Sequence, residues 1–171
     1  YENCTFAAYK TNLIAMKKIQ FEISYHSCKF EELTPEEKQL VEEARQATFR
    51  SYSPYSHFSV GASVLLANGV ILSGSNQENA AYPSGLCAER TVLFYANSQY
   101  PNQPITMMAI AARSEKGFTE IPITPCGACR QVLAETERRF EQPIRILLYG
   151  ETETIIIDGV KDLLPFLFDE D

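Results

Sequence analysis

Three cysteines of this chain lie in two short motifs whose residue types suit a metal ion. Cys126 and Cys129 form a C-x-x-C pair, and Cys87 stands earlier in the run Cys-Ala-Glu-Arg. Three thiolates with one open position are a donor set for catalytic Zn²⁺, which binds cysteine sulfur at about 2.3 Å. The spacing therefore predicts a zinc site whose open position serves chemistry rather than structure.

Glu89 follows Cys87 by two residues, so its carboxylate is expected near the metal without being needed as a ligand. A carboxylate there can accept a proton from water at the metal and pass it to a substrate. Zinc with three thiolates carries a net negative charge, which opposes ionisation of that water. Two helix N-termini aimed at the sulfurs would offset this charge, and Arg90 and Arg130 could donate hydrogen bonds nearby.

Other interpretations of these cysteines stay open. A C-x-x-C pair alone also occurs in redox dithiols, and a closed structural zinc site would need a fourth ligand such as His57 or Cys28. The five cysteines cannot all pair internally, so free thiols, metal ligands or catalytic groups are expected in a reducing compartment. We expect Cys4 and Cys28 to be free, inert thiols, and His26 and His57 to be ordinary polar residues.

Helices must bring the two cysteine motifs together, and hydrophobic periodicity predicts where these helices lie. Thr34 begins the clearest helix, because Pro35 suits the first helical position and Glu37 completes a capping box. This helix should run to about residue 50. Further helices are expected at 86–97, 127–139 and 160–164. Both cysteine motifs would then stand at the start of a helix.

Strands are predicted at 19–25, 58–66, 70–72, 105–112, 144–149 and 154–157. The first of them is inferred from alternating apolar and polar residues. Asn68-Gly69 predicts a tight hairpin turn with positive φ at both positions. The loop between the last two strands is too short for a parallel crossover, so these strands should be antiparallel. The pattern predicts an α/β fold, a three-layer α/β/α domain on one mixed β-sheet.

Length and charge limit the partners of this protein. The chain has 171 residues, enough for one domain, and its 15 Lys+Arg against 22 Asp+Glu give a formal net charge of −7. That balance disfavours a nucleic-acid partner. Since no run has the roughly 18 apolar residues of a membrane span and no secretory signal is found, we expect a soluble, cytoplasmic protein without a membrane partner. Residues 1–15 are interpreted as an extension or cloning remnant before a single catalytic domain over 16–171.

The cysteine motifs resemble those of the zinc-dependent cytidine deaminases, specifically the small three-cysteine homotetrameric type. The similarity extends from about residue 35 to 168, and its motifs lie at 54–62, 76–82, 87–90, 125–131 and 163–168. It implies the cytidine deaminase-like α/β/α fold and one Zn²⁺ per subunit, in a homotetramer or a dimer. It also implies a reaction of pyrimidine salvage, the hydrolysis of cytidine and deoxycytidine to uridine and deoxyuridine with release of ammonia.

The same resemblance implies a role for each site residue. Glu89 would carry protons, and the metal ligands would be Cys87, Cys126 and Cys129. Asn76 and Glu78 would hydrogen-bond the ribose 3′-hydroxyl of the nucleoside. The remaining contacts would come from Phe58 on the pyrimidine ring, Phe168 reaching in from a neighbouring subunit, Tyr82 near the 5′-hydroxyl, the backbone N–H of Ala88 at the ring carbonyl and the Thr124 carbonyl at the departing ammonia.

Simpler interpretations of these residues also stay open. Asn76 and Glu78 could merely shape a loop, and Phe58 could belong to the core. Phe166 competes with Phe168 for the role in the C-terminal segment.

Three other functions also stay open. They are another small-molecule aminohydrolase such as a blasticidin-S deaminase or a nucleobase enzyme, a non-catalytic zinc-stabilised assembly module, and editing of cytidines in RNA. The ribose motif at Asn76 and Glu78 disfavours a free base, and Glu89 disfavours a non-catalytic module. The acidic charge balance disfavours RNA.

Overall fold

The structure is a computed structural model that describes residues 17–169. Its strands are β1 (His26–Cys28), β2 (Ser59–Leu66), β3 (Ile71–Ser75), β4 (Ile105–Ser114), β5 (Gly117–Phe118), β6 (Arg145–Tyr149) and β7 (Thr154–Asp158). Its α-helices are α1 (Pro35–Ala47), α2 (Ala88–Gln99) and α3 (Gly127–Phe140). Short 3₁₀ turns lie at Phe30–Glu32, Thr48–Arg50, Tyr82–Ser84 and Val160–Asp162.

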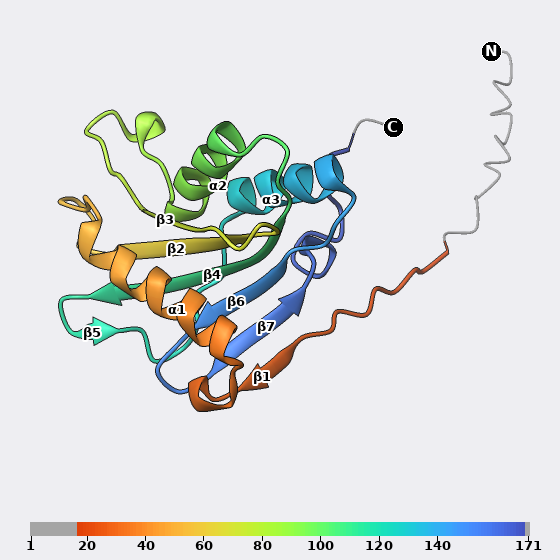
Figure 1. The fold of residues 1–171 in the computed structure, drawn as a ribbon, viewed down its shortest axis with the longest axis horizontal. Coiled ribbons are helices and arrows are strands. Elements are labelled where there is room, and N and C mark those ends of the chain that lie inside the picture. Colours follow the sequence, from red (N-terminus) through yellow and green to blue (C-terminus); the bar gives the residue numbers. More distant parts are fainter. Residues whose placement is uncertain (1–16, 170–171) are drawn as a thin grey trace, which may run out of the picture.

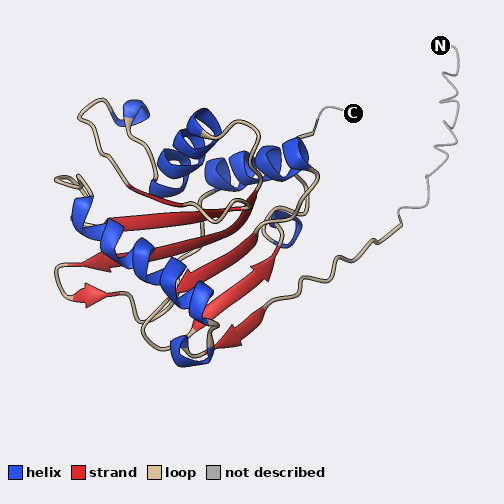
Figure 2. Ribbon diagram, viewed as in Figure 1, coloured by secondary structure: helices blue, strands red, loops and turns tan. Residues whose placement is uncertain are grey.

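The strands form one mixed sheet in the order β1-β7-β6-β4-β2-β3, with β5 beside β4. Among the strands of residues 17–169, only β4 and β6 pair in parallel, and α3 lies in the crossover between them. Helix α1 covers one face of the sheet, and α2 and α3 cover the other (Figure 1). Colouring by secondary structure shows the sheet between these two helical layers (Figure 2). The predicted three-layer α/β/α fold is therefore confirmed.

Strand β4 separates two hydrophobic cores, because successive side chains of a strand point to opposite faces. Met107, Ala109 and Ala111 pack in the core under α1. Met108 and Ile110 pack in the core under α2 and α3. A nearly continuous apolar run in one strand thus fills both faces, which is typical of a central strand covered on two sides.

The start of α1 has the predicted capping box. The Glu37 N–H donates to Thr34 Oγ1 at 3.3 Å, and the Thr34 N–H donates to the Glu37 carboxylate at 2.9 Å. Arg145 of β6 also donates to Glu37, at 2.9 Å, and to Asp158 of β7, at 2.6 Å. These contacts join the first turn of α1 to two strands of the sheet.

Residues 19–25 do not form the predicted strand, and the first strand is instead β1, which pairs with β7 at the edge of the sheet. In this segment, Ile19 and Phe21 are 69% and 58% exposed. Alternation alone does not make a strand, because the backbone also needs a neighbouring strand to bond. The last helix is also shorter than the predicted 160–164, with only a 3₁₀ turn at Val160–Asp162.

The hairpin between β2 and β3 uses a different turn from the predicted one. Gly69 has a φ of +83°, but Asn68 is not among the residues with positive φ. The Gly69 N–H donates to the Leu66 carbonyl at 2.9 Å, and the Leu66 N–H donates to the Val70 carbonyl at 2.9 Å. This pattern is typical of a three-residue loop, in which a single left-handed glycine completes the turn.

Residues 1–15, interpreted above as an extension, lie outside the described residues, as does Cys4. No helix in the described part of the chain is long and apolar enough to cross a membrane.

Candidate active site

The N-termini of α2 and α3 bring the three predicted cysteines together. Cys87 directly precedes α2, Cys126 directly precedes α3, and Cys129 lies in the first turn of α3. Their sulfur atoms all lie within 4.8 Å of one another. The Cys126 Sγ is 3.9 Å from that of Cys87 and 3.4 Å from that of Cys129. The two helix starts thus build one cluster from segments far apart in sequence.

The residues of this cluster fit zinc. Two sulfurs on a tetrahedral zinc ion are about 3.8 Å apart when each zinc–sulfur bond is about 2.3 Å. The two spacings from Cys126, 3.9 Å to Cys87 and 3.4 Å to Cys129, are close to that value. Within residues 17–169 neither His57 nor Cys28 belongs to the cluster, so the closed four-ligand site finds no support here. A donor set of three sulfurs is instead typical of a catalytic metal site.

Hydrogen bonding prepares one cysteine of the cluster to be a thiolate. The pKa of Cys87 is lowered to about 5, chiefly by a hydrogen bond with Cys129 and against the effect of burial. Arg90 contributes as well, because its Nη2 lies 3.6 Å from the Cys87 sulfur. The same contact with Cys87, together with burial, raises the pKa of Cys129. A divalent cation would replace the shared protons, because metal ligation requires deprotonated sulfur.

Glu89 is buried in the first turn of α2, with only 4% of its surface exposed. Burial raises the pKa of its carboxyl, and the Cys87 charge adds to this. Hydrogen bonds with its own backbone N–H and with the Cys129 thiol act in the opposite direction. A raised pKa makes this carboxyl group accept a proton more readily than an ordinary glutamate, which suits a residue that must both accept and donate protons.

Arg130 donates its hydrogen bonds to oxygen atoms of the loop before α3 and of Leu163. Its Nε donates to the Pro125 carbonyl at 2.8 Å, and its Nη2 donates to Thr124 Oγ1 at 3.2 Å. Its Nη1 donates to the Leu163 carbonyl at 2.6 Å. The side chain thus turns back toward the loop before α3 and bonds to the residue that directly precedes Cys126.

A cavity of about 550 Å³ opens beside the cysteine cluster. Its walls include Cys87 and Arg90 from the metal motif, and Asn76 and Glu78 from the ribose motif. Tyr82 also lines it. A cavity of this size suits a small molecule, and its polar groups converge from several loops. The structure therefore places the predicted metal and sugar motifs at one cavity.

The Asn76 side chain holds the backbone of β2 as well as facing the cavity. Its Oδ1 accepts a hydrogen bond from the Val60 N–H at 2.8 Å, and its Nδ2 donates to the Phe58 carbonyl at 3.0 Å. An amide oxygen can accept a second hydrogen bond, and an amide nitrogen can donate a second one. Loop shaping therefore accounts for part of what Asn76 does and leaves it able to bind a ligand.

The Glu78 carboxylate is oriented by a loop that sequence reasoning did not connect to it. Its Oε2 accepts hydrogen bonds from the Tyr55 N–H at 2.9 Å and the Ser56 N–H at 3.3 Å. The Ser56 hydroxyl, followed by the Tyr55 N–H, lowers the pKa of Glu78. Tyr55 and Ser56 lie within a motif of the resemblance, but no spacing rule pairs them with a residue more than 20 positions away.

The other predicted contact residues lie at different distances from the cavity. Tyr82 is 76% exposed, and its ring meets that of Tyr55 edge to face, with centroids 6.0 Å apart. Ala88 is buried as the first residue of α2. Thr124 is exposed, and its hydroxyl accepts a hydrogen bond from Arg130. Phe58 is half-buried and is not among the cavity walls in the described chain, so its place on a substrate ring stays a prediction.

Phe168 does not reach this cavity within a single chain. Its backbone is bound by Gln131 of α3, and its side chain is 72% exposed. Phe166, the competing residue, is 81% exposed and meets the Phe21 ring at 4.9 Å. A role for Phe168 in a site therefore needs a second copy of the chain.

Comparisons with known proteins agree with this fold and site. A family model for the cytidine and deoxycytidylate deaminase zinc-binding region matches residues 34–140. The chain is 43% identical over 129 residues to a cytidine deaminase of Halalkalibacterium halodurans, an alignment of 75% of this chain and 91% of that protein.

Solved structures show the same likeness. The cytidine deaminase of Burkholderia pseudomallei aligns with a TM-score of 0.65 and 35% identity, over 76% of this chain and 97% of that one. The cytidine deaminase of Mycobacterium tuberculosis aligns with a TM-score of 0.60 and 30% identity, over 77% and 96%. The α/β/α fold with three cysteines at two helix starts defines the class of zinc-binding deaminase domains. This chain belongs to the cytidine and deoxycytidylate deaminase family, as its sequence motifs predicted.

Proposed function

We propose that this protein is a zinc-dependent cytidine deaminase, which hydrolyses cytidine and deoxycytidine to uridine and deoxyuridine and releases ammonia. The observation that carries this function is the meeting of three cysteine sulfurs with the buried Glu89 beside a cavity of about 550 Å³. The relatives support it too, because proteins named cytidine deaminase align over most of their length. They support this function over a blasticidin-S deaminase or a non-catalytic module.

The cysteine cluster would hold one Zn²⁺ per subunit. When bound, zinc activates a water molecule by lowering its pKa toward about 7. The N-termini of α2 and α3 place partial positive charge at the sulfurs, and Arg90 adds a full positive charge beside Cys87. These groups stabilise the thiolates and offset the excess negative charge of a three-sulfur site.

Glu89 moves the protons of the reaction. Its carboxylate takes one proton from the attacking water and gives it to the ring nitrogen beside the carbon that bears the amino group. It then carries the remaining proton of that oxygen to the amino group, which leaves as ammonia. Burial raises the pKa of Glu89, so the carboxyl can hold each proton until it is delivered.

The cavity loops would bind the sugar. Glu78 accepts from two backbone N–H groups through Oε2, so its other oxygen is suited to accept a ribose hydroxyl. Asn76 would bind the same hydroxyl with its remaining amide capacity. Tyr82, on the cavity wall, would approach the 5′-hydroxyl.

Other residues would hold the base. The Ala88 N–H belongs to the first turn of α2, where N–H groups have no partner within the helix, and it would donate to the ring carbonyl. The Thr124 carbonyl would accept from the departing ammonia. Phe58 would pack on the ring, together with Phe168 of another subunit.

The assembly we propose is a homotetramer, with a dimer as the smaller alternative. Its support is the resemblance of the sequence motifs to the small three-cysteine homotetrameric type, together with the exposure of the Tyr82 and Phe168 rings, which a neighbouring subunit would cover. We also propose a cytoplasmic role in pyrimidine salvage, because three reduced thiols are needed to hold the metal.

One purified sample tests this function by metal analysis and a turnover assay together. We expect one zinc per chain and equal amounts of uridine and ammonia from cytidine. Blasticidin S, cytosine and a cytidine-containing oligonucleotide, assayed in parallel, should react far more slowly. Zinc binding without turnover of cytidine would contradict the proposal and favour the non-catalytic module.

A further inference from the structure

The side chain of Gln131, near the start of α3, binds the C-terminal segment, defined here as residues 163–169. Its Nε2 donates to the Phe168 carbonyl at 2.8 Å, and its Oε1 accepts from the Phe168 N–H at 3.2 Å. One side-chain amide thus satisfies both backbone groups of one residue, as a neighbouring strand would. Because the contact is made to the backbone, it fixes the segment and leaves the Phe168 ring free.

Arg130 fastens the start of the same segment. Its Nη1 donates to the Leu163 carbonyl at 2.6 Å. The same guanidinium donates to Thr124 Oγ1 and to the Pro125 carbonyl. Arg130 therefore joins the C-terminal segment to the loop directly before the metal ligand Cys126.

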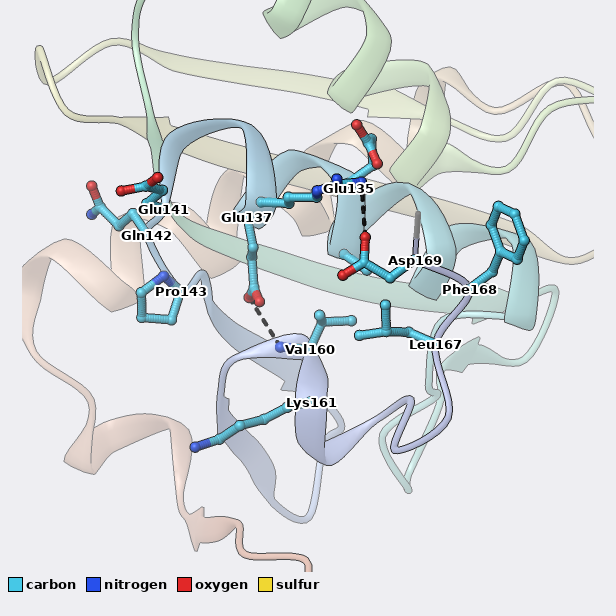
Figure 3. Close-up of a pocket in the computed structure, with 12 residues that line it drawn as sticks. Glu135, Glu137, Glu141, Gln142, Pro143, Val160, Lys161, Leu167, Phe168 and Asp169 are labelled. Atoms are coloured by element: carbon cyan, nitrogen blue, oxygen red, sulfur yellow. Dashed lines mark hydrogen bonds and ion pairs between the residues drawn. The ribbon is translucent and has the colours of Figure 1, made fainter. Parts of the chain in front are cut away.

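The far end of the segment also contacts α3, through an ion pair of 2.8 Å between Arg138 and Asp169. Between the anchors, Leu167 and Phe168 both line a cavity of about 310 Å³, where Leu167 lies beside Val160 and the Phe168 ring is directed away from both (Figure 3). The segment is thus held with one side chain inward and the next outward. The outward ring is the feature that this arrangement presents to another molecule.

We propose that Arg130 and Gln131 are positioning residues, which hold the C-terminal segment and its exposed Phe168 ring at a fixed place relative to the cysteine cluster. This inference rests on the proposed function and deepens it. Both residues directly follow Cys129, so the helical turn that carries a metal ligand also carries both anchors. Neither residue needs to touch the substrate to affect how it is bound.

The first test is Gln131→Ala in the full zinc-loaded protein, with amide hydrogen exchange as the measurement. The variant loses both bonds to Phe168, so the Phe168 amide should exchange about tenfold faster while zinc content stays unchanged. Gln131→Glu keeps the acceptor for the Phe168 N–H and should retain much of the protection. The control is Gln46→Ala, which removes an amide that donates to Glu42 on α1 and should leave the segment unaffected.

The second test is kinetic, with cytidine as substrate. Gln131→Ala and Arg130→Ala should raise KM about five- to tenfold and change kcat less, because the anchors act on placement rather than on proton transfer. Arg130→Lys, which keeps the charge and part of the hydrogen bonding, should recover part of the loss. The control is Arg139→Ala, since Arg139 donates to the Pro101 carbonyl and not to the C-terminal segment.

Unchanged exchange at Phe168 in Gln131→Ala, or faster exchange with an unchanged KM, would overturn the proposal. A failure of this inference can be distinguished from a failure of the proposed function. A wild-type protein that does not convert cytidine would overturn the function, while the exchange measurement would still decide whether Gln131 holds the segment.

Discussion

Two cysteines of the cluster differ in how readily they ionise. The pKa of Cys87 is lowered because Cys129 and Arg90 bond to its sulfur, whereas the contact with Cys87 and burial raise the pKa of Cys129. Metal binding must therefore displace protons from a partly ionised cluster. At the scale of single residues, the three thiols can therefore bind a cation once it displaces these protons.

Cys126→Ser should abolish stable zinc binding and with it turnover. Serine oxygen is a far poorer zinc ligand than thiolate, and the remaining two sulfurs cannot hold the ion as three do. Metal analysis after dialysis measures the effect. Cys28→Ser on β1 is the matched control and should retain its zinc; full zinc retention in Cys126→Ser would contradict the assigned ligand set.

Glu89→Gln should keep zinc but lose turnover by a factor of about 10² or more, because an amide cannot carry protons. The side chains are nearly the same size, so the buried site should stay intact. Zinc content and the initial rate with cytidine, measured on one sample, check this. Glu135→Gln, at an exposed position on α3, is the control. A near-normal rate in Glu89→Gln would refute the proton-transfer role.

Glu78→Gln should raise KM for cytidine about tenfold without changing zinc content. The amide oxygen can still accept from Tyr55 and Ser56, but the charge that strengthens a bond to a ribose hydroxyl is gone. Steady-state kinetics measure the effect, and Glu115→Gln at an exposed position is the control. This variant is cleaner than Asn76→Ala, which would also remove the hydrogen bonds to β2. An unchanged KM would remove Glu78 from the binding site.

At the scale of elements, the N-termini of two helices position the cysteine cluster. Helices α2 and α3 lie on the same face of the sheet, and their N-termini meet, so their first turns share one site. Helix α1 lies on the other face of the sheet and is joined to the strands by an ion pair. Its Glu37 connects a helix cap to Arg145 of β6 and is only 6% exposed.

Glu37→Gln should lower the free energy of unfolding by about 1–3 kcal/mol at pH 7, through the loss of charge-assisted hydrogen bonds. Burial alone would raise the pKa of Glu37, but hydrogen bonds from Thr34 and Arg145 outweigh it and hold the pKa below its ordinary value of 4.5. The carboxylate therefore stabilises the fold above pH 4.5, and this contribution is lost as the pH falls through the lower folded-state value.

Denaturant unfolding between pH 3 and pH 7 measures this effect. The difference between wild type and Glu37→Gln should shrink as the pH falls below about 4.5. Glu36→Gln, in the same turn but exposed, should change stability much less. A difference that stays constant across this range would contradict the ion pair as its source.

At the scale of the whole molecule, one chain does not bring Phe168 to the cavity beside the cysteine cluster. Two defective variants should therefore complement each other if subunits share sites. Co-expressed Glu89→Gln and Phe168→Ala chains should form hybrids in which an intact Glu89 meets an intact Phe168 from its neighbour. Activity above the sum of the two separate variants, together with sedimentation as a tetramer or dimer, is expected. No gain in a sample that does sediment as an oligomer would contradict sharing of Phe168.

The sequence by itself determined the metal motifs, the capping box of α1, the three α-helices and where most strands lie along the chain. These features depend on residues a few positions apart, where helix and strand geometry fix which side chains share a face. Thr34 and Glu37 cap their helix because they are three residues apart, and Cys126 and Cys129 share a helical turn for the same reason.

The tertiary structure alone decided which distant groups meet. Arg130 donates to the Leu163 carbonyl, 33 positions away, and Glu78 is held by a loop far from it in sequence. Residues 19–25 alternate as a strand does, yet no strand within residues 17–169 pairs with them. Such outcomes depend on how separate segments pack, because a hydrogen bond or a strand pairing needs a partner within reach, and local spacing does not specify that partner.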